Sequence, residues 1–552
     1  MSAKRFKLTK AAKILIVILV IALFGVGVFV GVKTGFIKTN SKTEMDKNEE
    51  VSKPDNTVAT PTPTKSDKPN KVEDNNTTVK DDDFSEKEDN LNVINLSIDE
   101  WVGYATIIQA NGGLQTQPGS IYDKLGIKVN ISIINDATQS SNALIKGSLD
   151  GAGYTINRLA FLSSKFSHAK VDIVMPYITN YSNGGDGIIA LSSIKTIEDL
   201  VDAKIGVPQF SESQAMIVWF VNQSDLPQSD KSKIINNLIL FETADETAKA
   251  FFAGKIDVAG TWQPYLTQAE NMTDSHIMFS TASSTKLIMS GIIFRDDFCK
   301  KNPELVSKFI DGTLQAVDLY SEELDVLRKS MPMFSGMSDE DIIDMTYDAD
   351  LTTWNDNMNI LKEDAKIIYS SMCDVWTSIG EVTDKSNVDD LFDLSYMESL
   401  RDKYETLVTD KEDTSKVIVT EENKQNILET TALLTKSASV NFIINTAKFV
   451  DTVEASKVLD EFIEVAKLLD GTIIQIEGNT DPNPNTDPTD EANILLSKQR
   501  AETVRQYFIA NGISADRIIV VGNGSSKPII ENDTAEHRAM NRRTDVSFKI
   551  IE

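Results

Sequence analysis

Apolar and polar positions alternate with two different periods along the middle of the chain. Segments 93–98 and 127–134 alternate with a period of two, which predicts β-strands. Segments 105–110 and 140–149 have the spacing of helices with one apolar face. This alternation of strands and helices predicts an α/β fold for residues 91–380, with helices packed on a mostly parallel sheet.

A short pattern occurs twice in this region. Residues 143–153 and 250–260 each run from an apolar helix through a glycine to an aspartate and then a strand. Gly147 and Gly254 suit the left-handed conformation that closes a helix. The repeat indicates two similar α/β lobes, although helix, glycine and strand also follow one another in many unrelated folds.

Polar and aromatic residues gather where the predicted strands end. Ligands of open α/β sheets bind beyond the carboxyl ends of the strands. A serine that begins a helix leaves N–H groups free for an anionic group. The pattern predicts a ligand cleft, with aromatic core positions as the alternative explanation, formed by Trp101, Tyr104, Thr155, Tyr181, Gly185, Asp186, Ser211, Trp262 and Tyr265.

These residues leave the charge of the ligand open. Aromatic rings with Asp186 and Glu212 suit an amine or another cation. Helix N-termini, together with Arg158, suit an anion instead. Both classes of solute therefore stay as alternatives.

The central region resembles the extracytoplasmic solute-binding proteins of ABC transporters, in particular the nitrate, sulfonate and taurine type. Residues 143–150, 197–208 and 250–265 carry the resemblance. It implies a two-lobed periplasmic-binding-protein fold that closes about a hinge, with residues 91–183 and 285–380 in one lobe and the residues between them in the other. It also implies an ABC permease as partner, and a ligand that favours the closed state by contacting both lobes.

The N-terminal part of the chain has neither the period of a strand nor the amphipathic spacing of a helix. A basic segment, residues 1–13, precedes the uncharged run Ile14–Val32, which is long enough to cross the roughly 30 Å core of a bilayer. Because no small-residue cleavage site ends the run, residues 14–36 are expected to be an uncleaved transmembrane helix with a cytoplasmic N-terminus. Residues 37–90 are rich in Lys, Asp, Asn, Thr and Pro, which predicts a disordered linker.

A charged connector, residues 381–433, leads into a last domain at 434–552. Its pattern predicts strands and helices in the order β-α-β-α-β-β. This order is that of a small α+β sandwich. The predicted strands lie at 440–444, 472–477, 517–522 and 544–550, and the helices at 455–469 and 493–510.

This last domain resembles the OmpA-like peptidoglycan-binding domain. Its matching residues are Gly478, Thr480, Asp481, Asn493, Leu496, Ser497, Arg500, Ala501, Val504, Gly522, Gly524, Pro528, Asn541, Arg542 and Arg543. The resemblance implies that Asp481 accepts from the ammonium of diaminopimelate in a peptidoglycan stem peptide, and that Arg500 forks onto a carboxylate. It adds Asn493, Asn541 and Arg543 to the site or to the fold around it. Asn479 stands where the family has histidine, and the loop 482–491 is longer than usual, so the stem peptide that fits stays open.

Composition excludes several functions. The formal net charge of −28 argues against nucleic-acid binding, which needs a basic face. Cys299, Cys373 and the three histidines have no metal-ligand spacing, and no motif pairs a histidine with a nucleophile. We therefore expect no cofactor and no enzymatic activity, and leave open whether the two cysteines pair.

The sequence thus predicts a single-pass, extracytoplasmic solute-binding protein that captures a small ligand for an ABC transporter and docks on the cell wall. The alternative is a structural wall-anchoring protein or a relative of motor stators, which also join a membrane helix to an OmpA-like domain. The uncharged span weakens the stator alternative, because a proton-driven stator needs an ionisable residue there.

Overall fold

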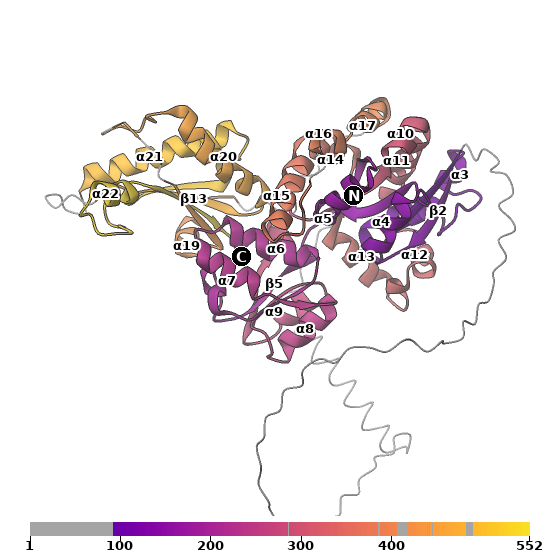
Figure 1. Cartoon of the computed structure of the whole chain (residues 1–552), viewed down its shortest axis with the longest axis horizontal. Coiled ribbons are helices and arrows are strands. Elements are labelled where there is room, and N and C mark those ends of the chain that lie inside the picture. The colour runs from indigo at the N-terminus through magenta and orange to yellow at the C-terminus, as the bar shows by residue number, and fades with distance from the viewer. Residues whose placement is uncertain are drawn as a thin grey trace, which may run out of the picture. The chain divides into compact units, whose positions relative to one another are not determined.

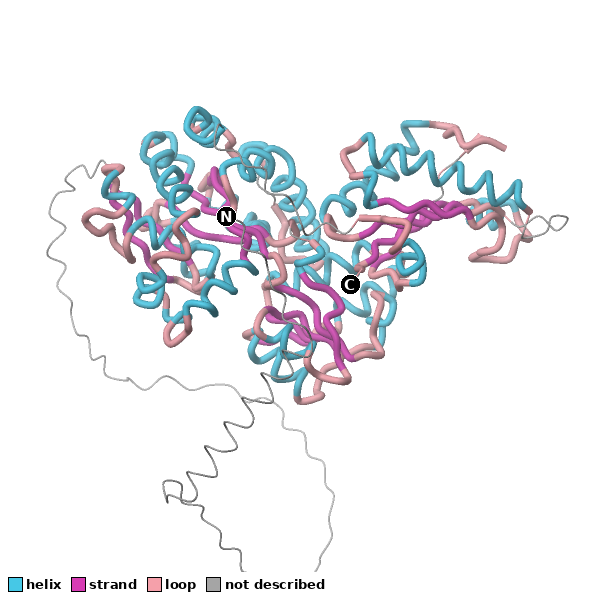
Figure 2. The backbone as a smooth tube through the Cα atoms, turned by 180° about the vertical axis from the view of Figure 1, so that it is seen from behind, coloured by secondary structure: helices cyan, strands magenta, loops and turns pink. Residues whose placement is uncertain are grey.

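The computed structural model describes residues 92–284, 286–384, 387–405, 418–438, 440, 442–443, 445–481 and 490–551. The basic segment, anchor and linker expected at 1–90 lie outside the described residues, as does loop 482–489. Within the described part of the chain, no helix is long and apolar enough to span a membrane. Figures 1 and 2 show three groups of strands, each with helices packed against it.

The first lobe is built on a six-stranded sheet in the order β11-β4-β10-β3-β1-β2. Its strands are β1 Val93–Ile98, β2 Lys128–Ile133, β3 Gly151–Thr155, β4 Ile173–Ser182, β10 Met289–Arg295 and β11 Ala349–Leu351. Strand β1 lies between β2 and β3 and runs parallel to both. Strand β10 runs antiparallel to β3 and to β4.

The second lobe has a five-stranded sheet in the order β7-β6-β8-β5-β9. Its strands are β5 Asp186–Leu191, β6 Ile205–Pro208, β7 Ile239–Phe241, β8 Val258–Trp262 and β9 Ser275–Ser280. The chain passes from the first sheet to the second between β4 and β5, and returns between β9 and β10. The two lobes are therefore joined by two crossings.

The expectation of mostly parallel sheets is wrong, because both sheets are mixed. Strand β5 is antiparallel to β8 and β9, while β6 is parallel to β7 and β8. Two of the antiparallel strands, β5 and β10, enter a sheet from the other lobe, and the third, β11, is the edge strand beside β4. Strands β5 and β10 do not follow a crossover helix on the same sheet, so the parallel direction of a β-α-β unit is not imposed on them.

Helices cover both sheets (Figure 1). Helix α15 packs against α5 and α6, so that helices of both lobes share one apolar contact. In that contact the Trp376 indole N–H donates to the Asn157 carbonyl at 3.1 Å, and the Phe161 and Phe210 rings stack 4.8 Å apart. The helices of the two lobes are α2 Ala105–Asn111, α3 Ile121–Lys124, α4 Ala137–Ile145, α5 Ile156–Ala169, α6 Glu212–Gln223, α7 Gln228–Asn236, α8 Ala244–Phe252, α9 Tyr265–Glu270, α10 Asp296–Lys301, α11 Pro303–Val317, α12 Leu324–Ser330, α13 Asp339–Asp348, α14 Trp354–Asn359, α15 Ala365–Ser378, α16 Val388–Leu391, α17 Ser395–Ser399 and α18 Arg401–Tyr404.

The repeated sequence pattern has the same local structure in each lobe. Helix α4 leads through Gly147, with φ of 73°, into β3, and α8 leads through Gly254, with φ of 66°, into β8. Both glycines occupy the left-handed region that a side chain would disfavour. The prediction of helix, glycine cap and strand is confirmed at both sites.

The last domain has a four-stranded sheet in the order β12-β15-β13-β14, with α20 and α21 packed on it (Figure 1). Strands β13 and β14 are parallel, and β15 is antiparallel to both β12 and β13. The elements are α19 Lys424–Glu429, β12 Leu434–Ala438, α20 Thr452–Leu468, β13 Ile473–Gly478, α21 Glu491–Ala510, β14 Ile518–Gly522, α22 Ala535–Asn541 and β15 Thr544–Lys549.

The strand predicted at 440–444 is wrong. The first strand of this sheet is β12, which pairs Leu434 with Phe548 and Ala438 with Thr544. Of the described residues in the predicted segment, Phe442 forms only an isolated bridge with Phe449. The residues from Val440 onward are more apolar than β12 and therefore look more like a strand in the sequence. The strand forms at β12 instead, because its pairing partner β15 comes from the end of the chain. A short helix, α22, also separates the last two strands.

Candidate functional site

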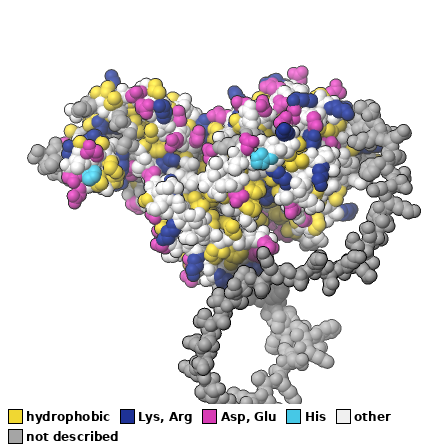
Figure 3. All heavy atoms as spheres, viewed as in Figure 1, with side chains coloured by type: hydrophobic (Ala, Val, Ile, Leu, Met, Phe, Trp, Pro, Cys, Tyr) yellow, Lys and Arg dark blue, Asp and Glu magenta, His cyan; other side chains and the backbone are white. Residues whose placement is uncertain are grey.

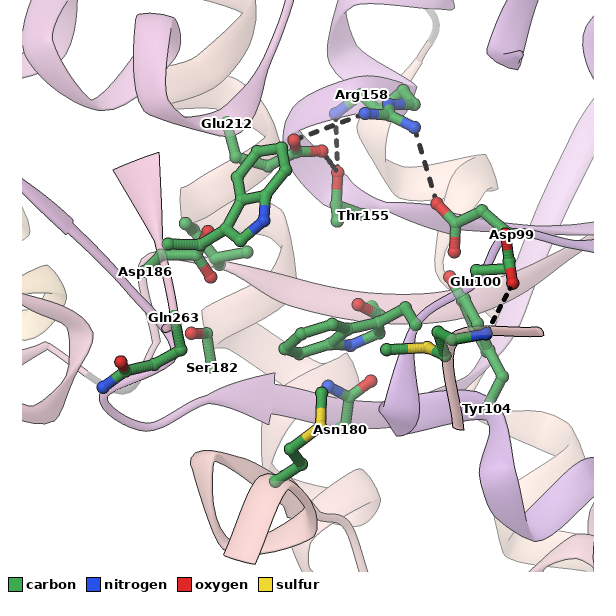
Figure 4. A pocket seen from close by; sticks show the side chains of 16 residues that line it. Asp99, Glu100, Tyr104, Thr155, Arg158, Asn180, Ser182, Asp186, Glu212 and Gln263 are labelled. Carbon is green, nitrogen blue, oxygen red and sulfur yellow. Dashed lines mark hydrogen bonds and ion pairs between the residues drawn. The ribbon is translucent and has the colours of Figure 1, made fainter. Parts of the chain in front are cut away.

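A cavity of about 210 Å³ lies between the two lobes (Figure 4). The first lobe contributes Asp99, Glu100, Trp101, Tyr104, Thr155, Arg158, Asn180, Ser182, Ile288, Ser290, Met333 and Met345. The second lobe contributes Asp186, Glu212, Trp262 and Gln263. A molecule in this cavity would contact both lobes at once.

The ends of strands and the starts of helices place most of these side chains. The segment from Asp99 to Tyr104 directly follows β1, and Trp262 and Gln263 follow β8. Thr155 ends β3 and caps α5, because its hydroxyl accepts from the Arg158 N–H at 3.0 Å. Since these ends meet at one edge of each sheet, the two lobes present their polar and aromatic residues to the same space.

Arg158 lies between carboxylates of opposite lobes. Its Nη1 is 3.5 Å from Asp99 Oδ2, and its Nη2 is 3.4 Å from Glu212 Oε2. The Thr155 hydroxyl also donates to Glu212 Oε1 at 2.7 Å. Figure 4 shows these groups as one chain of contacts along the wall of the cavity. The Glu212 charge raises the pKa of Arg158, against the effect of burial.

Two aspartates of the cavity have raised pKa values. Burial raises the pKa of Asp99 to about 6, although Arg158 opposes the shift. Burial also raises the pKa of Asp186 to about 7, and the nearby Glu212 charge adds to this, while the Ser182 hydroxyl opposes it. Both shifts arise because a carboxylate loses favourable hydration in a closed site.

Five of the nine predicted cleft residues line this cavity: Trp101, Tyr104, Thr155, Asp186 and Trp262. Gly185 packs against the Trp101 ring, since a Cβ added to Gly185 would lie 3.3 Å from that ring. The missing side chain of Gly185 therefore leaves room for Trp101.

Tyr181, Ser211 and Tyr265 are not among the lining residues. Side chains alternate along β4, so Asn180 and Ser182 face the cavity while Tyr181 lines a different one. Ser211 caps α6, where its hydroxyl accepts from the Gln214 N–H at 3.2 Å. The Tyr265 hydroxyl donates to Asp245 at 2.8 Å.

Sequence reasoning missed several residues of the cavity. Within the segment that ends β4, the period of two selects Asn180 and Ser182 for the cavity instead of Tyr181. Met333 and Met345 come from a short turn of helix at Pro332–Phe334 and from α13. Met333 and Met345 could not be predicted, because no local motif in these two segments indicates that they lie beside strand ends far away in the sequence. The missed residues are Asp99, Ile288, Ser290, Met333 and Met345, whereas Glu100, Asn180, Ser182 and Gln263 belong to the segments at the predicted cleft but were not chosen as its lining residues.

A second group of charged residues lies in the C-terminal domain. Asp481 Oδ2 is 3.3 Å from Arg542 Nη1. The Arg500 guanidinium lies 5.1 Å from the centre of the Phe442 ring, and its Nε donates to the Thr446 carbonyl at 3.1 Å. Burial, and then the Arg542 charge, lower the pKa of Arg500, while Asp481 opposes the shift. Asp481, Arg500 and Arg542 thus form one electrostatic group.

The other residues expected at this site make contacts within the C-terminal domain. Arg543 is buried, with its Nε 2.9 Å from Asp545 Oδ1 and its Nη1 donating to the Lys527 carbonyl. Asn541 is fully buried and accepts from the Ile529 N–H. Asn493 donates to Asp490 at 3.3 Å. Arg542, which sequence reasoning placed only in a motif, is the member of the arginine pair beside Asp481.

Two family models match the chain. The model described as NMT1/THI5 like matches residues 120–323, and the model of the OmpA family matches residues 441–542. The first match covers much of both lobes, and the second covers most of the C-terminal domain.

Curated relatives match the two parts separately. The peptidoglycan-binding protein ArfA of Mycobacterium tuberculosis is 39% identical over 90 residues, which are 16% of this chain and 26% of ArfA. A protein of Brucella abortus that is named a binding protein is 22% identical over 278 residues, or 47% of this chain and 81% of that protein. The chain spans between about a quarter and about half of the curated relatives that rank first.

Among solved structures, the periplasmic aliphatic sulphonate binding protein SsuA of Escherichia coli superposes with a TM-score of 0.43 at 15% identity. That superposition covers 55% of this chain and 99% of SsuA. The two family models match separate parts of the chain, and the NMT1/THI5-like match at 120–323 includes the residues that the second lobe contributes to the cavity.

Proposed function

We propose that this protein is an extracytoplasmic solute-binding protein that captures a small solute between its lobes and delivers it to an ABC permease. The observation that carries the proposal is the cavity lined from both lobes. A solute that contacts both sides favours the arrangement in which the lobes lie together. A permease that recognises this arrangement would then receive only loaded protein.

The connection between the lobes supports closure about a hinge. The crossings consist of the short segment between Ser182 and Asp186 and the longer one between Ser280 and Met289. Gly184 in the first crossing has φ of 102°, a conformation that side chains other than glycine rarely adopt. Changes in a few backbone angles at such connections are how two-lobed proteins open and close.

We further propose that the C-terminal domain holds peptidoglycan. Asp481 would accept from the ammonium of a diaminopimelate side chain, and Arg500 would bind its carboxylate. The name of ArfA, a peptidoglycan-binding protein, supports this proposal. Arg542 is added as a third contributor, because its guanidinium already lies beside Asp481.

The protein would be tied to the envelope at both ends. Residues 14–36 are proposed as a membrane anchor and residues 37–90 as a flexible tether. A tether of this length has a root-mean-square reach on the order of 40 Å. Solute capture would then take place outside the membrane, between the bilayer and the wall.

A thermal-shift screen of the full-length protein in detergent tests the first proposal. We expect at least one small solute to raise the melting temperature, because a ligand that binds only the folded state stabilises it. Matched variants that remove lining residues should abolish the shift. A protein that only anchors the wall would instead sediment with isolated sacculi and show no solute-dependent shift.

A further inference from the structure

The cavity between the lobes has an unequal balance of charge. Of the residues that line it, four are acidic, namely Asp99, Glu100, Asp186 and Glu212, and one, Arg158, is basic. A buried anion in such a site would face uncompensated repulsion, whereas a buried cation would be stabilised. The balance of charge favours a positively charged solute.

Arg158 is not available to bind an incoming anion. Its two terminal nitrogens lie against Asp99 and Glu212, and its side chain is 22% exposed. An anion would have to break at least one of these contacts and leave a carboxylate unpaired in a closed site. Because that costs more than the new contact gains, Arg158 acts as an internal counterion.

Asp186 is the carboxylate with the least compensation. Only 8% of its surface is exposed, and within the described part of the chain no ion pair includes it. Glu100, by contrast, already accepts from the Met333 N–H and from the Asn135 amide, each at 3.0 Å. Beyond the hydrogen bond from the Ser182 hydroxyl, the Asp186 carboxylate therefore keeps acceptor positions for a solute.

Two buried polar atoms of the cavity give an independent sign of a ligand. Asn180 is 1% exposed, and its Nδ2 has no hydrogen-bond partner among the described residues. Thr179 donates to the Asn180 Oδ1 at 3.0 Å, which turns the amide N–H groups away from that contact. Asp99 Oδ1 is also buried without a partner in the described structure. Unpaired buried polar atoms are rare and costly, so a bound molecule is expected to satisfy them.

Aromatic rings complete the site from both lobes. Trp101 comes from the first lobe and Trp262 from the second, and Trp262 is 36% exposed. The faces of indole rings attract cations within about 6 Å of the ring centre. A partly exposed tryptophan of the second lobe is well placed to cover a solute if the lobes close on it as proposed.

We infer that the captured solute is a small organic cation that bears an ammonium or amidinium group and one hydrogen-bond acceptor. Asp186, with Asp99 and Glu212, binds the charged group, the Asn180 amide donates to the acceptor, and the two tryptophans contact the apolar body. The cavity of about 210 Å³ restricts the solute to a small molecule. This inference rests on the proposed solute capture and names its substrate class.

The test is isothermal titration of the full-length protein in detergent at pH 8. The cationic probes are choline, tyramine and 4-hydroxybenzamidine, each of which carries an oxygen acceptor, and the anionic probes are nitrate and ethanesulfonate. We expect at least one cation to bind, and binding to weaken at least tenfold in Asp186→Asn and in Trp262→Ala. Asp202→Asn is the matched control in the same lobe, because that carboxylate is 88% exposed and contacts Lys233.

The outcomes separate the inference from the function on which it rests. Binding of an anion without any cation overturns the inference and leaves solute capture standing. Unchanged cation binding in both Asp186→Asn and Trp262→Ala also overturns the inference. Silence across both panels counts against solute capture itself. If Asp186→Asn does not fold, Trp262→Ala carries the same test, because its side chain is partly exposed.

Discussion

Arg158 Nη2 in the first lobe lies 3.4 Å from Glu212 Oε2 in the second, so one ion pair joins α5 to the first turn of α6. The two side chains are only 22% and 10% exposed. The same Glu212 accepts from Thr155, which begins α5. The wall of the cavity is therefore also a contact between lobes, and a solute that changes this wall changes how the lobes meet.

Removal of Arg158 should destabilise the protein. In Arg158→Met, Asp99 and Glu212 remain as neighbouring acidic groups without their counterion. We expect the free energy of unfolding to fall by about 2 kcal/mol, somewhat less than for a fully buried pair. Urea unfolding at pH 8 measures the change.

The exposed pair Lys233–Asp202 provides the control, and Lys233→Met should cost less than about 0.5 kcal/mol. The double variant Arg158→Met with Glu212→Gln should recover part of the loss, because one acidic group is then neutral. A single Arg158→Met variant as stable as the control would contradict the assigned role of this pair.

Asp186 should make the protein less stable as the pH rises. Its pKa is about 7 in the folded protein, against an ordinary value of 3.8, so the folded state binds more protons between these values. Stability is then highest when the carboxyl is protonated and is lost as the pH rises from about 4 to about 7.

Asp186→Asn removes this titration. We expect the variant to exceed the wild type by up to about 4 kcal/mol at pH 8 and by little at pH 4, since three pKa units correspond to that energy. Urea unfolding at the two pH values checks the difference. An equal gain at both would show that packing, and not ionisation, is responsible.

Much of the fold could be predicted because its signals are local. The alternation in Val93–Ile98 gave β1 with its observed bounds, and Gly147 and Gly254 ended helices as expected. The direction of β5 and β10, and the pairing of β12 with β15, depend on partners from distant parts of the chain. A period in the sequence carries no information about such partners.

The cavity was predictable to a smaller extent, for a related reason. Strand ends drew attention to Trp101, Asp186 and Trp262, which all line it. Tyr181 was a wrong choice, because side chains alternate along β4. Its two chain neighbours, Asn180 and Ser182, face the cavity instead. Met345 comes from a helix of the first lobe that only the folded chain brings to the site.

The proposed peptidoglycan site should depend on Arg500 and Asp481. Arg500→Gln and Asp481→Asn are each expected to weaken sedimentation with isolated sacculi at least tenfold, because each removes a charge-assisted hydrogen bond. The matched control is Arg505→Gln on the same helix, whose guanidinium contacts Glu502 at 3.0 Å. Sedimentation that stays unchanged in both site variants would rule out these roles.

Arg542→Gln separates the two arginines of the pair. Arg542 is 41% exposed beside Asp481, whereas Arg543 is buried against Asp545. We expect Arg542→Gln to weaken sacculus binding without a change in melting temperature, and Arg543→Gln to lower the melting temperature. If Arg542→Gln lowers the melting temperature, the role of Arg542 is structural and the proposed contact with peptidoglycan is contradicted.

The pH dependence of solute binding discriminates between the two charges that the solute can have. A cation binds to the ionised form of Asp186, whose pKa burial raises to about 7, so protons compete with it. Glu212 adds to that shift, and Asp99 titrates nearby with a pKa of about 6 beside Arg158.

From pH 8 to pH 6, competition between protons and the cation at Asp186 alone should weaken solute binding by about tenfold. Titration calorimetry of the wild type and of Asp186→Asn measures this, and the variant should show a much smaller dependence. An anion would give the opposite sign, since it would bind more tightly as the carboxylates become neutral.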